Sequence, residues 1–385
     1  MSPGRDWLLW ALLAWIASIS GMAHGGTQVD VHASKDALMT AAGGVLRQVD
    51  LEDLSAGSTT QLVSRGITVA ALGEPPGVLF ITQDSMLHAG LIGIIASSPT
   101  MLGTQGARIE LPRGERHFGF WLRSEGCLAE PVPLSWRLLD AAGNELASGA
   151  QALDDGCPVP GDLHPVYIGW SSSVAFHAVE FSRGGLLQWF DDLAFAAVDV
   201  DLSLSAEPLP GERQLASFDE LSVPLTAPFD SGGLSFSGGA QVWDDFVGFT
   251  HSQIFGGQAT PPNFVLTNLR MAATTSTPAD GLELQARTIC IGAATMNLMM
   301  QMGGNQVDYL AVPVLATGPL QLSQLRLYDR LQVDGAALGN FLCNLMLDDL
   351  TLVRTHLFQD DFESGLATQT TGLSPSNAWS AKRDK

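Results

Sequence analysis

Two pairs of adjacent aspartates are the residues whose types and spacing most favour chemistry. The first acidic pair is Asp191 and Asp192, the second acidic pair is Asp348 and Asp349, and each stands between an apolar residue and a leucine. Neighbouring carboxylates raise each other's pKa unless a cation lies between them. A hard cation that prefers oxygen, above all Ca²⁺, binds such groups with several ligands. Strand-capping turns are the alternative interpretation, because Asp is common in turns.

An acidic dipeptide also opens each half of the chain. Glu52 and Asp53 come first, and Asp219 and Glu220 follow at an offset of 167 residues. The closing pairs are offset by 157 residues, and loop deletions between fixed strands produce such a shrinking offset. We interpret the pattern as two tandem copies of one module, with chance similarity as the alternative.

The elements that position these residues are short strands. In the segment His117 to Leu122, Phe118, Phe120 and Leu122 share one face of an alternating pattern. Leu134 to Leu139 and Glu145 to Ala147 flank a Gly/Asn turn and predict a hairpin, while helical periodicity is nearly absent. This spacing predicts an all-β protein of two tandem β-sandwich, jelly-roll-like domains.

The expected organisation follows from these patterns and from the places where they stop. Pro208, Pro210 and Gly211 interrupt the strand pattern between the halves. The predicted segments are a signal peptide (1–23), an N-terminal arm (24–48), domain 1 (49–200), a linker (201–215), domain 2 (216–353) and a C-terminal tail (354–385).

The opening and closing motifs and the hairpin resemble secreted bacterial jelly-roll modules of the galactose-binding-like, carbohydrate-binding-module type. In that group a calcium ion, where present, lies between the first strand and an Asp-Asp element on the last strand. The resemblance implies that the ligand candidates are Glu52, Asp53, Asp191 and Asp192 in the first copy and Asp219, Glu220, Asp348 and Asp349 in the second.

Glycan binding by such modules depends on exposed aromatic rings that stack on sugar faces. Trp121, Trp136 and Trp170 are the candidates, Trp121 because it lies opposite the Phe118 and Phe120 face. The alternative is that each ring packs between sheets or under a loop. A polysaccharide or surface glycan is the expected partner.

The charge balance excludes other partners. Forty acidic residues against 19 basic ones give a net charge of −21, which disfavours nucleic acid.

Residues 7–19 form an apolar run too short for a membrane anchor, so it predicts a cleaved secretory signal and no membrane span in the mature chain. The chain is then expected to be secreted, periplasmic or on the cell surface of a bacterium.

The four cysteines, Cys127, Cys157, Cys290 and Cys343, are an even number in an exported chain, which favours disulfides. Three pairings are formally open. Division of the chain near residue 205 makes Cys127–Cys157 and Cys290–Cys343 the economical choice.

No catalytic motif stands out, and His117 and His177 are expected to be structural residues inside strands. We therefore expect a non-catalytic, calcium-stabilised protein that binds glycan or matrix or acts at the cell surface. The alternatives are a secreted hydrolase with its site between the two domains and a purely structural or adhesive module.

Overall fold

The computed structural model of the chain describes residues 27–49, 51, 53–73, 77–83, 100–124, 132–153, 166–184, 186–205, 207–246, 249–250, 254–255, 263–288, 294–314, 319–336 and 345–355. Strands dominate these ranges, together with a seven-residue helix, α2 (Lys35–Ala41). The predicted all-β class is therefore confirmed. Across the described ranges, no helix has the length and apolar character that a membrane crossing requires.

The first half of the described chain, residues 27–200, forms two packed antiparallel sheets. Its strands are β1 (Val29–His32), β2 (Leu46–Val49), β3 (Gly57–Thr59), β4 (Gln61–Ser64), β5 (Ile67–Ala71), β6 (Leu79–Gln83), β7 (Thr100–Thr104), β8 (Gly106–Ser124), β9 (Leu134–Leu139), β10 (Glu145–Gln151), β11 (Val166–Ser182) and β12 (Gln188–Ala196). Strands β8 and β11 are long, and irregular register between Ser171 and Ala178 lets both contribute to the two sheets. One sheet includes β10, β9, β11, β8, β5 and β4, and the other includes β1, β11, β8, β12, β7 and β6.

The second half, residues 201–355, is built from antiparallel strands as well. These are β13 (Asp201–Ser203), β14 (Glu212–Ala216), β15 (Leu225–Thr226), β16 (Phe229–Ser231), β17 (Leu234–Trp243), β18 (Asp245–Phe246), β19 (Phe249–Thr250), β20 (Phe264–Ala279), β21 (Gly281–Thr288), β22 (Ala294–Met302), β23 (Asn305–Val314), β24 (Leu320–Ser323), β25 (Tyr328–Ala336) and β26 (Leu345–Arg354). Strands β17, β20, β25, β22 and β23 pair in that order, while β14, β26, β21 and β24 form a second series.

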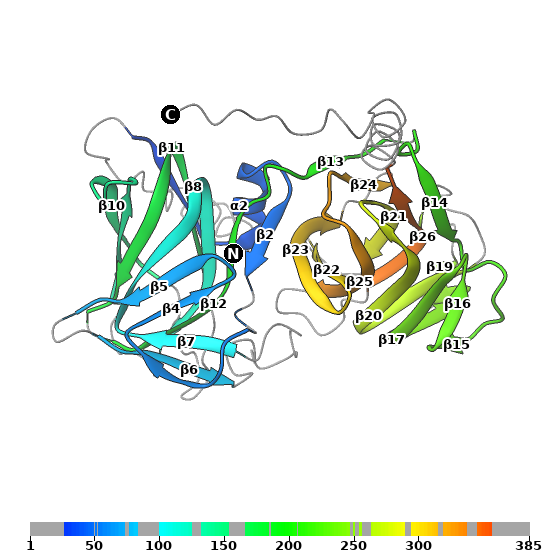
Figure 1. Cartoon of the computed structure of the whole chain (residues 1–385), viewed down its shortest axis with the longest axis horizontal. Coiled ribbons are helices and arrows are strands. Elements are labelled where there is room, and N and C mark those ends of the chain that lie inside the picture. The colour runs from blue at the N-terminus through cyan, green and yellow to red at the C-terminus, as the bar shows by residue number, and fades with distance from the viewer. Residues whose placement is uncertain are drawn as a thin grey trace, which may run out of the picture.

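Each half buries its own apolar cluster. The first cluster includes Phe118, Phe120 and Leu122, which are fully buried on one face of β8 as the alternation predicts. The larger cluster lies mainly in the second half, where it includes Leu298 and Val333, and it also takes in Val45 from the first half. Figure 1 shows the two groups of strands side by side, with α2 and β2 toward the region between them.

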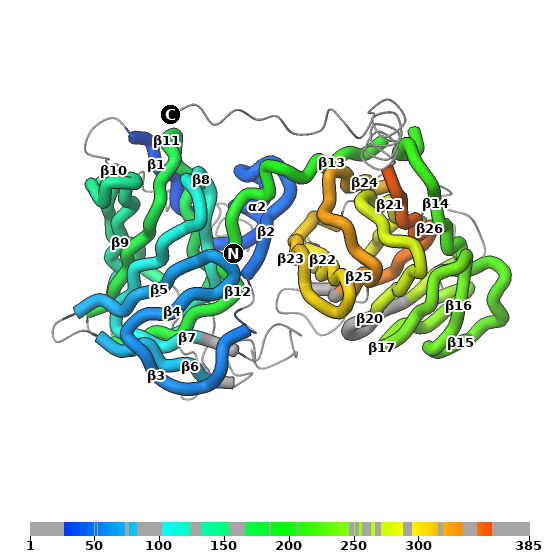
Figure 2. The backbone as a smooth tube through the Cα atoms, viewed as in Figure 1, coloured from blue at the N-terminus to red at the C-terminus, as the bar shows by residue number. Residues whose placement is uncertain are grey.

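The halves are joined by strand pairing as well as by the chain. Strand β2 pairs with β12 on one side and with β23 on the other, where Leu46 lies opposite Ala311 and Arg47 opposite Leu310. Figure 2 shows β2 between the strands of the first half and β23. A small apolar cluster that includes Leu38 and Tyr167 packs around the same place. The backbone hydrogen bonds of β2 thus connect the two halves.

Two predicted segments differ from the structure. The segment 24–48 is predicted to be an N-terminal arm, but its described part belongs to the folded structure, because it contains β1, α2 and most of β2. The predicted linker 201–215 contains β13, which pairs with β24, and most of β14, which pairs with β26. In both segments long-range pairing orders residues whose local pattern is weak.

Candidate functional site

A cavity of about 490 Å³ lies between the two halves, beside β2. Residues from distant parts of the sequence line it. Strand β2 contributes Arg47 and Gln48, β8 contributes Arg113, and β23 contributes Gln306 and Asp308. Tyr309 of β23 also lines it, as do Arg65, Asp199 and Arg326, which lie in connections between strands.

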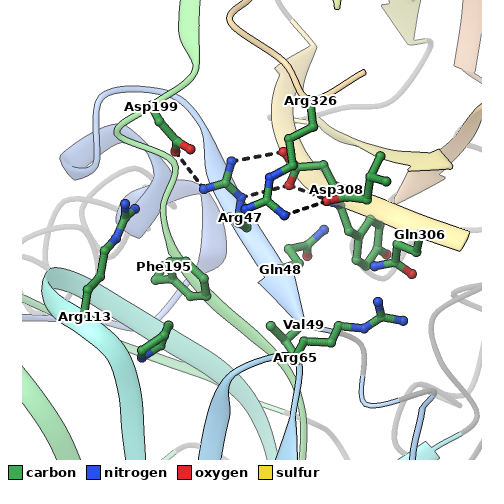
Figure 3. A pocket seen from close by; sticks show the side chains of 13 residues that line it. Arg47, Gln48, Val49, Arg65, Arg113, Phe195, Asp199, Gln306, Asp308 and Arg326 are labelled. Atoms are coloured by element: carbon green, nitrogen blue, oxygen red, sulfur yellow. Dashed lines mark hydrogen bonds and ion pairs between the residues drawn. The ribbon is translucent and has the colours of Figure 1, made fainter. Parts of the chain in front are cut away.

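Arg47 holds two carboxylates at this cavity, one from each half (Figure 3). Its Nε donates to Asp308 Oδ1 at 2.8 Å and its Nη2 donates to Asp308 Oδ2 at 3.0 Å. Its Nη1 donates to Asp199 Oδ1 at 2.7 Å. The pair with Asp308 is bidentate, which is the geometry that makes guanidinium–carboxylate contacts strong and directional.

The environment of Arg47 keeps this group charged. Burial by itself would lower the pKa of Arg47, but the hydrogen bonds to Asp308 and Asp199 outweigh burial and raise it. Burial would raise the pKa of Asp199, and the contact with Arg47 lowers it instead. Arg47 and Asp199 are therefore ionised at neutral pH.

Arg113 and Arg326 add positive charge to the cavity. Arg113 Nε donates to Glu115, a buried carboxylate on β8, at 2.6 Å. Burial raises the pKa of Glu115 in spite of this ion pair. Arg326 donates from Nη1 to the backbone oxygen of Val307 at 3.0 Å and is exposed. Each of these two guanidinium groups also carries N–H groups other than the one in the contact just named.

Behind Arg47, polar side chains cross between the halves. Lys35, only 4% exposed, donates from Nζ to Gln48 Oε1, and Gln48 Nε2 donates to Asn297 Oδ1 at 3.1 Å. Thr295 Oγ1 donates to Asp36 Oδ1 at 2.7 Å. Buried polar groups that are satisfied in this way rigidify the region that contains them.

The first acidic pair lies next to this network. Burial lowers the pKa of the Lys35 ammonium, and the nearby carboxylates of Asp192, Asp36 and Asp191 act in the opposite direction. Burial together with Asp192 and Asp36 raises the pKa of Tyr167. The Tyr167 hydroxyl and Asp192 Oδ1 have no hydrogen-bond partner in the described ranges.

The opening and closing strands are neighbours in each half. Val49 lies opposite Leu193 in the β2–β12 pair, and Ala216 lies opposite Leu350 in the β14–β26 pair. These two pairings are equivalent under the offsets of 167 and 157 residues. The backbone therefore brings the acidic elements of each half to the same edge.

The closing acidic pairs share one local geometry. Asp192 and Asp349 have φ values of 51° and 48°, in the left-handed region that Asp tolerates better than most residues. The backbone N–H of each donates to Oδ1 of the preceding aspartate, at 2.7 Å for Asp191 and 2.8 Å for Asp348. The register of both strands is irregular here, so the pairs form β-bulges.

The opening acids also have partners within the protein. Ser64 Oγ donates to Asp53, and its counterpart Ser231 donates to Glu220 at 2.6 Å. The backbone N–H of Asn263 contacts Asp219 at 3.4 Å. Glu52 lies outside the described residues.

The described residues do not test the predicted calcium site at the first acidic pair, because Glu52 lies outside them. No group of three or more His, Cys, Asp or Glu side chains gathers as a metal site in the part of the chain that the structure describes. A protein cation, Lys35, already lies near Asp191 and Asp192. Calcium in either half stays a prediction.

The tryptophan candidates do not form an exposed platform. Trp170 and Trp136 are 0% and 3% exposed, with ring centroids 5.9 Å apart inside the first cluster. Neither ring is available for stacking on a sugar in this structure, because core side chains cover both. Trp121 is partly buried and packs edge-on against Tyr167 at 5.3 Å.

Three further predictions lie outside the described residues: the signal peptide, the four cysteines and most of the C-terminal tail. Cys127, Cys157, Cys290 and Cys343 all fall in ranges that the structure does not describe.

Sequence reasoning missed the residues that line the cavity. Arg47, Arg113, Asp308 and Arg326 form no motif in the chain. The one available signal is Arg47-Gln48 between the apolar residues of a four-residue strand, and it does not identify its partner 261 positions away.

No family model matches the chain, and no curated protein matches it. Similar solved structures include the CBM22-1–CBM22-2 tandem domain of Xyn10C from Paenibacillus barcinonensis, with 12% identity over 81% of this chain and 98% of that chain and a TM-score of 0.20. A two-domain protein of unknown function from Bacteroides fragilis shows 10% identity over 84% and 100% of the two chains, with a TM-score of 0.26.

A third similar structure contains the CBM32-1, CBM32-2 and M60 catalytic domains of ZmpB from Clostridium perfringens. It shows 8% identity over 87% of this chain and 41% of that chain, with a TM-score of 0.20. Similarities with TM-scores this low do not indicate the function of this chain.

Proposed function

We propose that the protein is an exported, non-catalytic β-sandwich protein that binds a glycan in the cavity between its two halves. The observation that carries the proposal is the lining of that cavity, which combines guanidinium and amide donors with apolar surface from Phe195 and Pro112. Sugars present hydroxyl groups on their edges and C–H groups on their faces, so such a mixed lining suits them.

The cavity is also held in shape before a ligand arrives. Arg47 fixes Asp308 and Asp199 in defined positions, and the β2–β23 pairing fixes the strands that carry Arg47 and Asp308. A preformed site binds with a smaller loss of conformational entropy than a site that must be assembled.

Binding fits the cavity better than glycoside hydrolysis does. A general acid needs a raised pKa, and the pKa of Asp199 is lowered by Arg47. Glu115 has a raised pKa, but its side chain is buried against Arg113. The carboxylates at the cavity therefore serve to hold arginine.

The proposal includes two modules of common origin. The support is the recurrence of the Ser64–Asp53 contact as Ser231–Glu220 and of the bulge at Asp192 as that at Asp349. The galactose-binding-like type, the domain boundaries and export remain part of the proposal.

The test is retention of the mature protein on a panel of immobilised polysaccharides, neutral and charged. We expect retention on at least one, reduced by Gln306→Ala and unchanged by Arg137→Ala. Arg137 borders a second cavity of about 520 Å³ on the β9–β10–β11 face, so it is a matched control. Retention lost with Arg137→Ala but not with Gln306→Ala would refute the assignment to the cavity between the halves.

A further inference from the structure

The cavity between the halves concentrates positive charge in a strongly acidic protein. The chain has a net charge of −21 and sixteen arginines, and four of these arginines line this one cavity. Two of the forty acidic residues line it with them. Charges of one sign that gather in a concave site attract ligands of the opposite sign.

The carboxylates of the cavity do not neutralise all of this charge. Arg47 contacts both lining aspartates, Asp308 through two nitrogens and Asp199 through one. Arg113 contacts Glu115 through Nε and lies near enough to Asp199 to help lower the pKa of that carboxyl, but its two terminal nitrogens form no ion pair among the residues that the structure describes. Arg326 has a backbone carbonyl as its partner and forms no ion pair within the described residues.

Neutral hydrogen-bonding groups lie at the same cavity. The Gln306 amide is half-buried, and Asp199 is half-exposed while Arg47 contacts one of its oxygens. An amide donates to and accepts from hydroxyl groups, and the free carboxylate oxygen accepts from them. The lining therefore offers partners for sugar hydroxyls beside partners for an anion.

We propose that the ligand is a glycan of sugar acids, whose carboxylate contacts Arg326 and Arg113 while its ring hydroxyls contact Gln306 and Asp199. This inference rests on the proposed function and specifies its ligand class. The planar guanidinium fork matches a carboxylate through two parallel hydrogen bonds. A neutral sugar would place hydroxyl groups against these charges, and a hydroxyl binds a guanidinium less strongly than a carboxylate does.

The experiment measures the affinity of the full mature chain for polygalacturonate, for neutral galactan and for a sulfated galactan of similar length. We expect binding to polygalacturonate at least about tenfold tighter than to galactan, because a hydrogen-bonded charge pair contributes about one factor of ten. Arg326→Gln should weaken polygalacturonate binding about five- to tenfold and leave galactan binding unchanged. Added salt should weaken the binding of polygalacturonate, because salt screens the attraction between its carboxylates and the arginines.

Arg330→Gln is the matched control, because Arg330 is exposed on β25, carries the same charge and does not line the cavity. An equal loss with both variants would refute a specific role for Arg326. Equal affinity for galactan and polygalacturonate, or binding to the sulfated galactan alone, would overturn the sugar-acid assignment while glycan binding stands. Binding to none of the three and to no member of the wider panel would refute the proposed function itself.

Discussion

Replacing Arg47 by methionine tests whether the Arg47–Asp308 ion pair holds the two halves together. Methionine keeps most of the apolar stem that packs beside β23 and removes only the guanidinium. The change leaves the Asp308 carboxylate, with a side chain 1% exposed, without its two strongest donors. The Tyr309 backbone N–H remains as a donor to Asp308 at 3.0 Å.

The magnitude follows from the burial of each partner. Removing one member of a buried ion pair costs about 3–5 kcal/mol, because the other charge stays buried without compensation. Asp199, with a side chain 48% exposed, is solvated after the change, and its pair contributes less than about 1 kcal/mol. We therefore expect Arg47→Met to lower the free energy of unfolding by about 4 kcal/mol.

The double variant Arg47→Met/Asp308→Leu separates loss of the pair from loss of packing. Apolar replacement of a whole buried ion pair is often nearly neutral, so we expect the double variant to be within about 1–2 kcal/mol of the wild type. The two changes should then show a coupling energy above about 2 kcal/mol.

The assay is urea unfolding at neutral pH, followed by far-UV circular dichroism and tryptophan fluorescence, with Arg330→Met as the control. Arg330→Met should change the free energy of unfolding by less than about 0.5 kcal/mol, because it is an exposed residue. A cost below about 1 kcal/mol for Arg47→Met, or a coupling energy near zero, would refute the reasoning, because Asp308 would then have to be solvated.

Three other predictions follow from single contacts. Burial lowers the pKa of His117 below 6.5, so the unfolded chain binds more protons than the folded chain as the pH falls below about 6.5. The melting temperature should therefore fall as acid is added. The variant His117→Asn should make the melting temperature depend less on pH. A Cβ on Gly149 would lie 2.6 Å from the Trp136 ring, so Gly149→Ala should cost about 1–3 kcal/mol in urea unfolding, and a neutral result would contradict the packing. We expect a chelator to leave the melting temperature unchanged, because Lys35 lies near the first acidic pair; a fall of several degrees that calcium reverses would support the calcium prediction instead.

The strands were predictable where the pattern is local. Leu134–Leu139 is β9 as predicted, and alternate residues along it are buried and exposed in its first four positions. Phe118 and Phe120 point into the core for the same reason, since a strand buries every second residue. A half-buried sheet face leaves this mark in the sequence whatever its partner strands are.

Helix α2 and strand β1 were not predictable on that basis. Seven residues make about two turns, too few for a clear helical period, although Ser34 caps the helix by accepting the Ala37 N–H at 3.2 Å. Strand β1 has four residues, and its register comes from β11, more than a hundred positions away. Tertiary contacts therefore determine both elements.

The candidate site was not predictable because its members are near neighbours only after folding. Arg47 and Asp308 are 261 positions apart, and Arg47 and Asp199 are 152 apart. The acidic pairs, in contrast, were visible as a repeated motif, but their regularity reflects a shared β-bulge. The repeated motif therefore marks a backbone feature that both halves contain.

Several contacts that join the halves come from segment 27–49. Lys35, Asp36, Arg47 and Gln48 all precede the first acidic dipeptide, and Asp36, Arg47 and Gln48 contact residues of the second half. At the offset of 167 residues, position 35 corresponds to Leu202, which carries no charge. The backbone geometry of the second acidic pair is nevertheless the same as that of the first. Segment 27–49 thus links the two halves through β2 and supplies Arg47 and Gln48 to the arginine-lined cavity, where we expect the ligand to bind.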